Sequence, residues 1–427
     1  MATLAMIVVL LALMVVRVPV CAAMGLAAIA GLVMLDMPLD TLVRYMATDV
    51  RSVPLLAIPF FVLAGNLMNR FDMTRRIFDF LHSVVGYFSG GLAQVAVLTT
   101  LVFGGISGSA LATIAGVGVI TIHAMRKAGY RPEFAAALVV AASLIDPLIP
   151  PSIMFIIYAV QMNVSIAALF VAGIVPGVLL GVLLMIHNVV VAKLGIERFP
   201  PPEPPSWLRL RSTFVRGVPA LLTPIVIMRS MTTGLVTPTE ASVLAVLYTI
   251  VIGVLHREFT WRRLLLAFDE TVRATALIMF ITAIGSVMGF VMTSERTAAT
   301  VGEWMVSFTD DKLVVLVLVA VALLVMGVFL EAIPVMLIAV PLFGPLLVSY
   351  GVDPIHFGVV LTYAILLGIV HPPIGLGIFA VCAITKLKME PVVRATLVFY
   401  PVLLLCLLLL LFVPELSTWL PRVLLTR

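Results

Sequence analysis

Long apolar stretches separated by short polar loops recur along nearly the whole chain, from residue 6 to residue 420. Stretches of this length are typical of helices that cross the roughly 30 Å hydrocarbon core of a membrane. The pattern predicts spans at about 2–16, 18–35, 53–69, 134–160, 165–193, 217–236, 238–255, 271–293, 357–385 and 395–421. Two further apolar stretches, at about 80–125 and 313–349, contain polar interruptions and are predicted to be hairpins that enter and leave the membrane on one side.

Two predicted spans contain a Pro-Pro pair within an apolar run. The pairs lie in Leu148-Ile149-Pro150-Pro151-Ser152 and in Val370-His371-Pro372-Pro373-Ile374-Gly375. Proline removes a backbone donor and clashes with the preceding turn, so both spans are predicted to break there. The freed carbonyl groups are tolerated in a membrane only beside protein or a watery cavity. Paired interruptions in two halves of a chain indicate the binding site of a secondary transporter.

Loop charges predict that the two hairpins enter from opposite faces. The loops beside the first hairpin carry Arg70, Arg75 and Arg76 on one side and basic residues of 126–131 on the other, which places both in the cytoplasm. The flanks of the second hairpin, 294–312 and 350–356, have no basic excess and are predicted to lie outside, as are both chain termini.

This orientation predicts an inverted repeat in an all-α polytopic membrane protein. Each half has three spans, a hairpin and two spans, of which one is broken. Because five crossings are an odd number, the second half runs in the opposite direction. The predicted halves are residues 1–193 and 217–427, joined by a cytoplasmic, proline-rich linker at 194–216.

The composition agrees with a membrane protein and excludes several functions. The chain is 63% hydrophobic and 11% charged, whereas a soluble domain is about half apolar and one quarter charged. The net charge of +5 lies in short loops, so we expect no nucleic-acid partner. Cys21, Cys382 and Cys406 show no metal-ligand spacing. Since the chain lacks a P-loop, a zinc-protease motif, a nucleophile elbow and a dinucleotide fingerprint, we expect neither enzyme activity nor coupling to ATP.

Hairpin tips and helix breaks supply the oxygen ligands that bind a cation, while helix N-termini attract an anion. The ion-site candidates of the first half are Ser107, Gly108 and Ser109 at the tip and Asp146, Pro147 and Ile149 at the break. Those of the second half are Gly327, Glu331, Ala332 and Pro334 at the tip and Gly368, His371 and Pro372 at the break. Candidate substrate contacts are Ser107, Pro150, Ser152, Pro372 and Arg229.

Each candidate also has a structural interpretation. Gly104 and Gly108 could serve close helix packing. Asp146 and His371 are expensive to bury and therefore indicate function, but they could also satisfy each other or face water. Glu331 could snorkel or cap a hairpin helix. Arg229 could meet a substrate carboxylate, although an ion pair with Glu240 or snorkelling to the surface is favoured.

One polar motif has a strong structural explanation. In Thr237-Pro238-Thr239-Glu240, a capping threonine is followed by proline at the first helical position and by glutamate at the third. This arrangement predicts a capping box at the start of a helix.

Several motifs, in this order, resemble the large membrane subunit of tripartite ATP-independent periplasmic (TRAP) transporters. They are Ala57-Ile58-Pro59-Phe60-Phe61-Val62-Leu63-Ala64-Gly65-Asn66, Gly105-Ile106-Ser107-Gly108-Ser109, Ile149-Pro150-Pro151-Ser152, Thr237-Pro238-Thr239-Glu240-Ala241, Asp353-Pro354-Ile355-His356-Phe357-Gly358 and Pro372-Pro373-Ile374-Gly375. Together they extend over almost the entire chain.

The resemblance implies an elevator-type secondary transporter in the bacterial inner membrane. A periplasmic binding protein would deliver a small organic acid, such as a C4-dicarboxylate or sugar acid, to this subunit and a small four-helix membrane subunit. Sodium ions bound at the tips and breaks would drive uptake, with no other cofactor, in a setting of membrane lipid. A self-sufficient sodium/carboxylate symporter is the alternative, and a channel is disfavoured because the sequence has no continuous polar face.

The chain departs from the family pattern at three places. Asp146 stands where glycine is common, His371 where threonine is usual, and Arg229-Ser230 where a Gly-Gly pair is usual. These differences predict that one sodium site is altered. His371 could make that site sensitive to protons, because imidazole changes charge near neutral pH.

Overall fold

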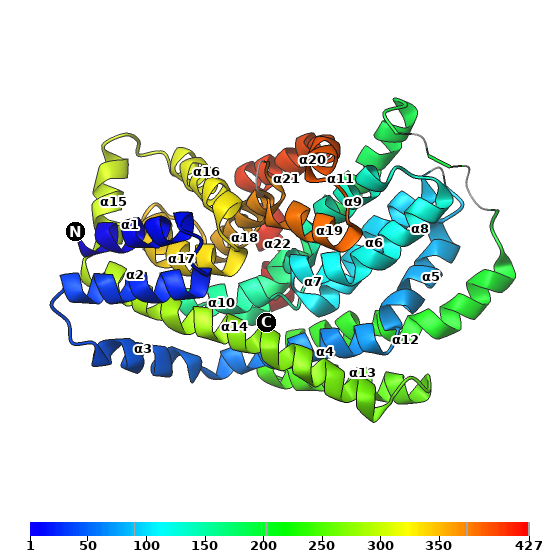
Figure 1. Ribbon diagram of the computed structural model, residues 1–427, viewed down its shortest axis with the longest axis horizontal. Helices are drawn as coiled ribbons and strands as arrows, with labels where there is room; N and C mark the ends of the chain where they lie inside the picture. The colour runs from blue at the N-terminus through cyan, green and yellow to red at the C-terminus, as the bar shows by residue number, and fades with distance from the viewer. Residues whose placement is uncertain (89, 198, 201–203, 373–374, 426–427) are drawn as a thin grey trace.

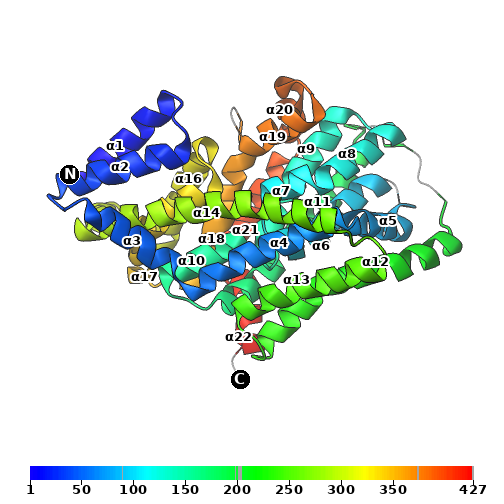
Figure 2. The ribbon, with the colours of Figure 1, turned by 60° about the horizontal axis from the view of Figure 1, so that its bottom comes forward.

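The computed structural model describes residues 1–88, 90–197, 199–200, 204–372 and 375–425, and every regular element in these ranges is a helix. Figures 1 and 2 show an elongated bundle in which α14 (Trp261–Ser294) runs along much of the molecule beside α4 (Ala57–Arg70). By length and composition, seven described helices can each cross a membrane, and two bent pairs raise this number to nine. The predicted all-α polytopic class is confirmed.

The N-terminal segment contains the three predicted spans and one additional helix. The spans are α1 (Ala2–Val15), α2 (Val20–Met34) and the 3-10 turn η1 (Val53–Leu56) continued by α4. Between them lies α3 (Asp40–Val50), which the apolar pattern missed because it is amphipathic and carries an Asp40–Arg44 ion pair. The start of α1 is fixed to the end of α14, because the Ala2 and Thr3 N–H groups donate to the Glu295 carboxylate at 2.6 and 2.7 Å.

The first hairpin is shorter than predicted. The prediction of 80–125 included the end of a separate helix, α5 (Met73–Val85). A turn in which Gly90 has a φ of +75° separates α5 from the hairpin, and glycine adopts this conformation without strain. The hairpin itself comprises α6 (Gly91–Ser107), α7 (Ala110–Ala115) and α8 (Val117–Ala128).

The first broken span agrees with the prediction. It consists of α9 (Pro132–Ala142), the 3-10 segment η2 (Ser143–Leu148) and α10 (Ile153–Met162). The chain bends by 42° between the two parts. The long helix α11 (Ile166–Lys193) follows and completes the predicted first half.

The second half begins with two longer helices than expected. The span predicted at 217–236 is α12 (Trp207–Thr232), and the span predicted at 271–293 is α14. The first turns of both helices carry charged residues, so the apolar pattern did not include these turns in the predicted spans. Between them, α13 (Pro238–Leu255) has the predicted bounds. Residues 198 and 201–203 of the predicted linker lie outside the described residues.

The capping box at the start of α13 is confirmed. The Thr237 hydroxyl accepts from the Glu240 N–H at 3.3 Å, and the Glu240 carboxylate accepts from the Thr237 N–H at 2.7 Å. Thr239 donates its hydroxyl to the Val53 carbonyl at 3.1 Å and so connects α13 to η1. The motif therefore has a structural role.

The second hairpin is α16 (Lys312–Phe329) with α17 (Ala332–Ser349), close to the predicted 313–349, and it follows α15 (Thr297–Val306). The second broken span has arms α18 (Pro354–Val370) and α19 (Leu376–Thr385). Pro373 and Ile374, between these arms, lie outside the described residues. Both halves thus contain a hairpin followed by a broken span. The inversion of the second half and the domain limits stay predictions.

The stretch predicted as one continuous span at 395–421 is interrupted. The chain forms α20 (Met389–Leu397), α21 (Tyr400–Phe412) and α22 (Glu415–Leu425), with a 52° bend between the first two. Pro401 in the first turn of α21 and Pro414 just before α22 explain the interruptions, because proline favours helix starts and disfavours helix interiors.

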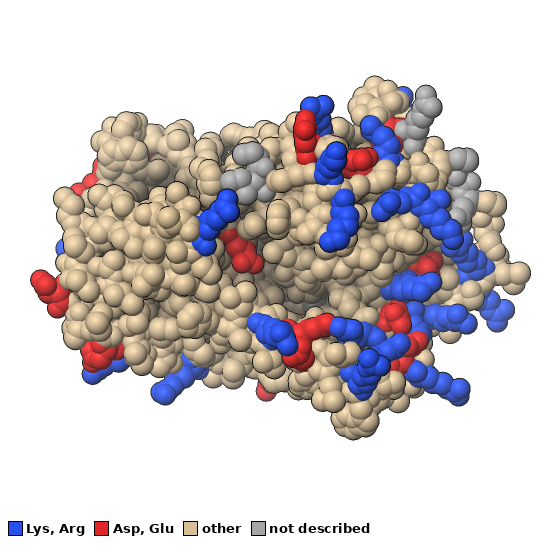
Figure 3. All heavy atoms as spheres, viewed as in Figure 1, with Lys and Arg blue, Asp and Glu red and all other residues tan. Residues whose placement is uncertain are grey.

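Charge is distributed unevenly over the face that Figure 3 shows. Figure 3 shows Lys and Arg gathered over the end that carries α5, α8 and α12, whereas the end that carries α1 and α15 has few. This distribution agrees with the positive-inside expectation that basic loops share one side of the membrane.

Candidate functional site

The two hairpin tips and the two broken spans meet at one cavity of about 90 Å³. We call residues 107–109 the first tip and residues 330–331 the second tip. The lining residues are Gly108, Ser109, Ala110 and Leu111 of the first hairpin, Pro147, Ile153 and Met154 of the first broken span, Ile278 of α14, Glu331, Ala332 and Ile333 of the second hairpin, and Leu366 and Ile369 of α18. Segments far apart in the sequence therefore form one site.

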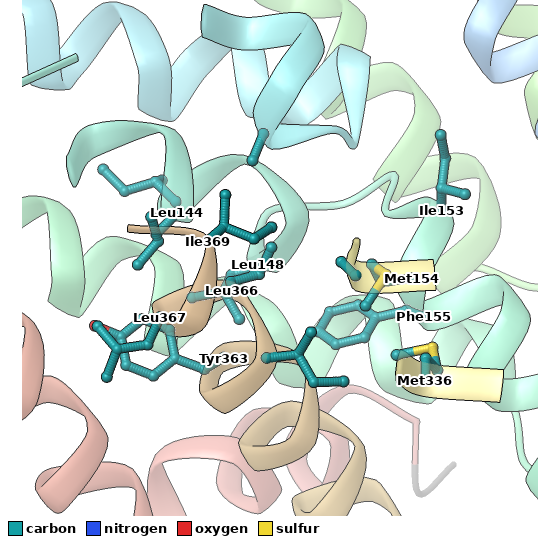
Figure 4. Packing of buried hydrophobic residues seen from close by; sticks show 14 of the residues in the cluster. Leu144, Leu148, Ile153, Met154, Phe155, Met336, Tyr363, Leu366, Leu367 and Ile369 are labelled. Carbon is teal, nitrogen blue, oxygen red and sulfur yellow. The ribbon is translucent and has the colours of Figure 1, made fainter. Parts of the chain in front are cut away.

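Buried apolar side chains hold the two broken spans together around this site. Figure 4 shows Leu148 of η2 near Leu366 and Ile369 of α18, with Phe155 of α10 and Met336 of α17 on the other side. All of these side chains are almost completely buried. The cavity is therefore set into a packed core.

The first tip lies directly on the first helix break. Gly108 has a φ of +64°, and a Cβ added to it would lie 2.5 Å from the Pro151 carbonyl oxygen. Ser109 then caps α7, since its hydroxyl accepts from the Ala112 N–H at 3.5 Å. The tip glycine is therefore required for packing, whatever else it does.

The candidates at the first break have mostly structural contacts. Ser152 is fully buried and caps α10, accepting from the Phe155 N–H at 3.3 Å. The Ile149 side chain packs on α11, where its Cδ1 is 2.5 Å from a Cβ added to Gly177. Ser152, Ile149 and Pro150 are not among the residues that line the cavity. The Pro150 carbonyl oxygen instead faces the first hairpin, 3.5 Å from a Cβ added to Gly105.

Asp146 is fully buried, and its segment η2 packs on α6 and α7. Its Oδ2 accepts a hydrogen bond from the Thr113 hydroxyl. The Ser107 side chain and the backbone of Gly108 and Ser109 lie close to the carboxylate, but its Oδ1 completes no hydrogen bond. The structure thus brings Asp146 together with all three residues of the first tip.

Glu331 lies at the cavity, at the start of α17. It occupies the cap position without making a capping hydrogen bond, so the capping interpretation is not realised. Its side chain is half-buried, and no hydrogen bond or ion pair of it is found among the described residues. The first residues of α17 and of α10 line the same cavity, so two helix N-termini, which favour negative charge, are directed at it.

The second hairpin packs on the second broken span through glycine. A Cβ on Gly327 would clash with the Ile365 carbonyl oxygen, and Gly368 faces Gly327. Beyond them, the His371 N–H donates to the Gly368 carbonyl at 3.0 Å. Its ring meets Tyr400 edge-on with 5.4 Å between centroids, and Nδ1 contacts the Pro372 carbonyl. Among the described contacts His371 does not reach Asp146, so these two residues do not satisfy each other.

Arg229 is not at the cavity. It lies exposed on α12, and Glu240, its suggested partner, bonds instead to Thr237. This placement matches the surface interpretation of Arg229.

Sequence reasoning missed the apolar walls of the cavity and Thr113. Ile278 belongs to α14, and only the folded chain places it opposite the tips. Thr113 could have been found, because it is a polar residue four positions after Ser109 in an apolar stretch.

Comparisons with known proteins agree with this architecture. Residues 7–416 match the family described as "Tripartite ATP-independent periplasmic transporter, DctM component". The sialic acid TRAP transporter large permease protein SiaM of Vibrio cholerae is 34% identical over 89% of this chain and 88% of that protein. The sialic acid TRAP transporter permease protein SiaT of Haemophilus influenzae is 34% identical over 87% of this chain, which spans only 60% of the length of that relative.

Solved structures show the same fold at low identity. The YdaH transporter of Alcanivorax borkumensis superposes with a TM-score of 0.63 at 15% identity, over 91% of this chain and 88% of that one. MtrF of Neisseria gonorrhoeae gives a TM-score of 0.57 at 13% identity, over 87% of this chain and 83% of that one.

Proposed function

Because the chain belongs to the DctM component family of TRAP transporters, as a large permease subunit, we propose that it carries a small organic acid across the bacterial inner membrane. Similar permeases are named for sialic acid, for C4-dicarboxylate and for 2,3-diketo-L-gulonate. The proposed substrate is accordingly a C4-dicarboxylate or a sugar acid.

The observation that carries this proposal is the single cavity at which both tips and both broken spans meet. The N-termini of α10 and α17 would hold the substrate carboxylate, because unpaired backbone N–H groups and the helix dipole favour an anion there. The apolar walls formed by Leu111, Ile278 and Leu366 would exclude water around the rest of the substrate.

An elevator motion is proposed for the hairpins and the broken spans. Contacts without room for a side chain, such as Gly108 on Pro151 and Gly327 on Ile365, support their movement as one body. The helices α4, α13 and α14 would form the scaffold, since α4 packs on both α13 and α14. Ile278 places the cavity at the border between these two groups.

Sodium is proposed as the coupling ion, and its gradient would supply the free energy of uptake. The residues at the first tip and the first break fit such an ion, because Asp146 has an unsatisfied Oδ1 and Ser107 adds a hydroxyl. Ser109, Gly108 and Ile149 complete that candidate set. In the second hairpin the candidates remain Gly327 and Glu331, and at the second break they remain Gly368 and His371. Oxygen ligands of this kind suit a hard cation.

The proposed partners are a small four-helix membrane subunit and a periplasmic binding protein. The test is uptake of a labelled acid into proteoliposomes, with and without each partner and with an inward sodium gradient. Uptake that requires both partners and the gradient supports the proposal. Uptake by this chain alone would favour a self-sufficient symporter, and flux that ignores the gradient would contradict secondary transport.

A further inference from the structure

A second pocket, of about 550 Å³, lies between the start of α5, the first half of α12 and the end of α13. It is separate from the substrate cavity, since no residue lines both. A close contact holds α12 against α5 beside it, because a Cβ added to Gly217 would lie 2.8 Å from the Cβ of Phe80. All three elements contribute arginines to the lining, namely Arg75, Arg76, Arg216 and Arg257.

Part of the charge in this pocket is paired within the protein. The Arg76 guanidinium lies 2.9 Å from the Glu258 carboxylate. Arg263, at the start of α14, also pairs with Glu258 and lies 3.5 Å from the Asp72 carboxylate. Two of the acidic lining residues, Glu258 and Asp72, therefore already have cationic partners.

The remaining charge of the lining is unbalanced. Arg75, Arg216 and Arg257 are exposed, and none of them makes an ion pair or a side-chain hydrogen bond among the described residues. Of the acidic side chains that line the pocket, only Asp79 is left to face them. Three guanidinium groups against one carboxylate leave an excess of two positive charges. Guanidinium groups bind phosphate oxygens through paired N–H donors, so the pocket fits a phosphate group.

Apolar side chains beside the arginines indicate that this phosphate belongs to a lipid. Leu255 lines the pocket and is 74% exposed, and Val215, next to Arg216, is 68% exposed. Trp261, at the start of α14, is 71% exposed, and tryptophan is enriched where a membrane meets water. A phosphate that carries acyl chains can place its charge among the arginines and its chains along the exposed apolar side chains.

We propose that this pocket binds the phosphate of an anionic phospholipid, with Arg75, Arg216 and Arg257 around the phosphate and Leu255 against an acyl chain. Basic pockets between helices on the cytoplasmic side are suited to anionic headgroups, and the loop charges predict that this end faces the cytoplasm. The bound lipid connects α5, α12 and α13. Such a site is independent of the transported substrate and of the coupling ion.

Native mass spectrometry of the purified, delipidated full chain tests the site by counting bound lipids. Phosphatidylglycerol, which is anionic, is titrated in one series, and phosphatidylcholine, which has a phosphate but no net charge, in another. We expect the first phosphatidylglycerol to bind at a several-fold lower concentration than the first phosphatidylcholine. Inorganic phosphate at the same concentration as the lipid should not displace it, because it lacks acyl chains.

Substitutions of opposite effect assign the binding to this pocket. Arg216→Gln combined with Arg257→Gln should raise the phosphatidylglycerol concentration for half-occupancy several-fold. Asp79→Asn removes the remaining carboxylate and should lower that concentration. The matched control is Arg229→Gln, which removes an exposed arginine farther along α12 and should leave it unchanged.

Thermal unfolding provides a second measurement and shows that each variant folds. A lipid that binds only the folded chain raises the unfolding midpoint. Phosphatidylglycerol should therefore raise the midpoint of the unaltered chain and of Arg229→Gln more than that of the double arginine variant.

Three results would overturn the proposal. Equal binding of phosphatidylglycerol and phosphatidylcholine would exclude recognition of the charge. Unchanged phosphatidylglycerol binding in the double arginine variant would place the lipid elsewhere. Displacement of the lipid by an equal concentration of inorganic phosphate would show that the pocket takes free phosphate and not a lipid.

Discussion

Gly368 of α18 and Gly327 of α16 are in direct backbone contact, and a Cβ on Gly368 would lie 2.5 Å from the carbonyl carbon of Gly327. Both residues were candidates for an ion site on sequence grounds. The contact shows that they also determine how closely the second hairpin approaches the second broken span.

Replacing Gly368 should therefore destabilise the protein. We expect Gly368→Ala to lower the free energy of unfolding by about 1–3 kcal/mol, the usual cost of overfilling a packed interior. Thermal unfolding in detergent measures the effect. The control is Gly25→Ala, where a Cβ would meet Ile284 at an ordinary 3.7 Å. Equal stability of the two variants would contradict the role assigned to the glycine contact.

Glu331 is expected to control sodium-driven uptake through the second tip. Glu331→Gln keeps the size of the side chain and removes its charge, so the sodium concentration for half-maximal uptake should rise several-fold. Arg229→Gln, on the exposed face of α12, should leave this value unchanged. Uptake into proteoliposomes at varied external sodium measures this concentration for both variants. A sodium dependence of Glu331→Gln equal to that of the unaltered chain would show that Glu331 does not belong to the ion site.

The capping box predicts a stability effect without a transport effect. Thr237→Ala removes the hydroxyl that accepts from the Glu240 N–H, which costs about 1 kcal/mol at a helix start. We expect a lower unfolding midpoint and unchanged uptake per folded molecule. Thr237→Ser should restore the midpoint. Loss of uptake in Thr237→Ala would indicate that the motif does more than cap α13.

Glu258, in the loop between α13 and α14, predicts a pH dependence of stability. The hydrogen bond and charge of Arg263, followed by those of Arg76, lower the pKa of Glu258. Since the folded pKa is below the unfolded value, this contribution is present at neutral pH and is lost as the pH falls through the folded pKa. Glu258→Gln should unfold at a lower temperature at pH 7, with the difference vanishing in acid.

The matched control for this prediction is Glu390→Gln. Glu390 pairs with Arg394 one turn away on the surface of α20, where ion pairs contribute little. Its unfolding midpoint should follow that of the unaltered chain at every pH. A pH-independent difference between Glu258→Gln and the unaltered chain would show that packing, not charge, is responsible.

Sequence reasoning located elements well where a local signal marks their ends. The capping box marks the start of α13, and the polar residue Glu331 marks the turn of the second hairpin, so both were placed closely. Sequence reasoning failed where a single glycine or proline was the only mark of an interruption within a long apolar stretch. Gly90 ends the segment before the first hairpin, and Pro414 divides the C-terminal stretch, but both were read as parts of continuous runs.

The site was predictable only in part. The pairing of tips with breaks identified the residues that surround the cavity, because proline and glycine mark interruptions locally. The sequence could not reveal that His371 faces Tyr400, or that Ile278 closes the cavity, since both contacts join residues far apart in the chain. It also could not show that Ser152 already uses its hydroxyl to cap α10.

The cavity is bounded by the start of α10 and by the start of α17. These two helix ends leave the ribosome far apart in time, so the substrate site does not exist until most of the chain has been synthesised. A truncated product that stops before α16 would contain the first tip and the first break but no enclosed site. Such a fragment could insert into the membrane without becoming an uncontrolled leak for the substrate.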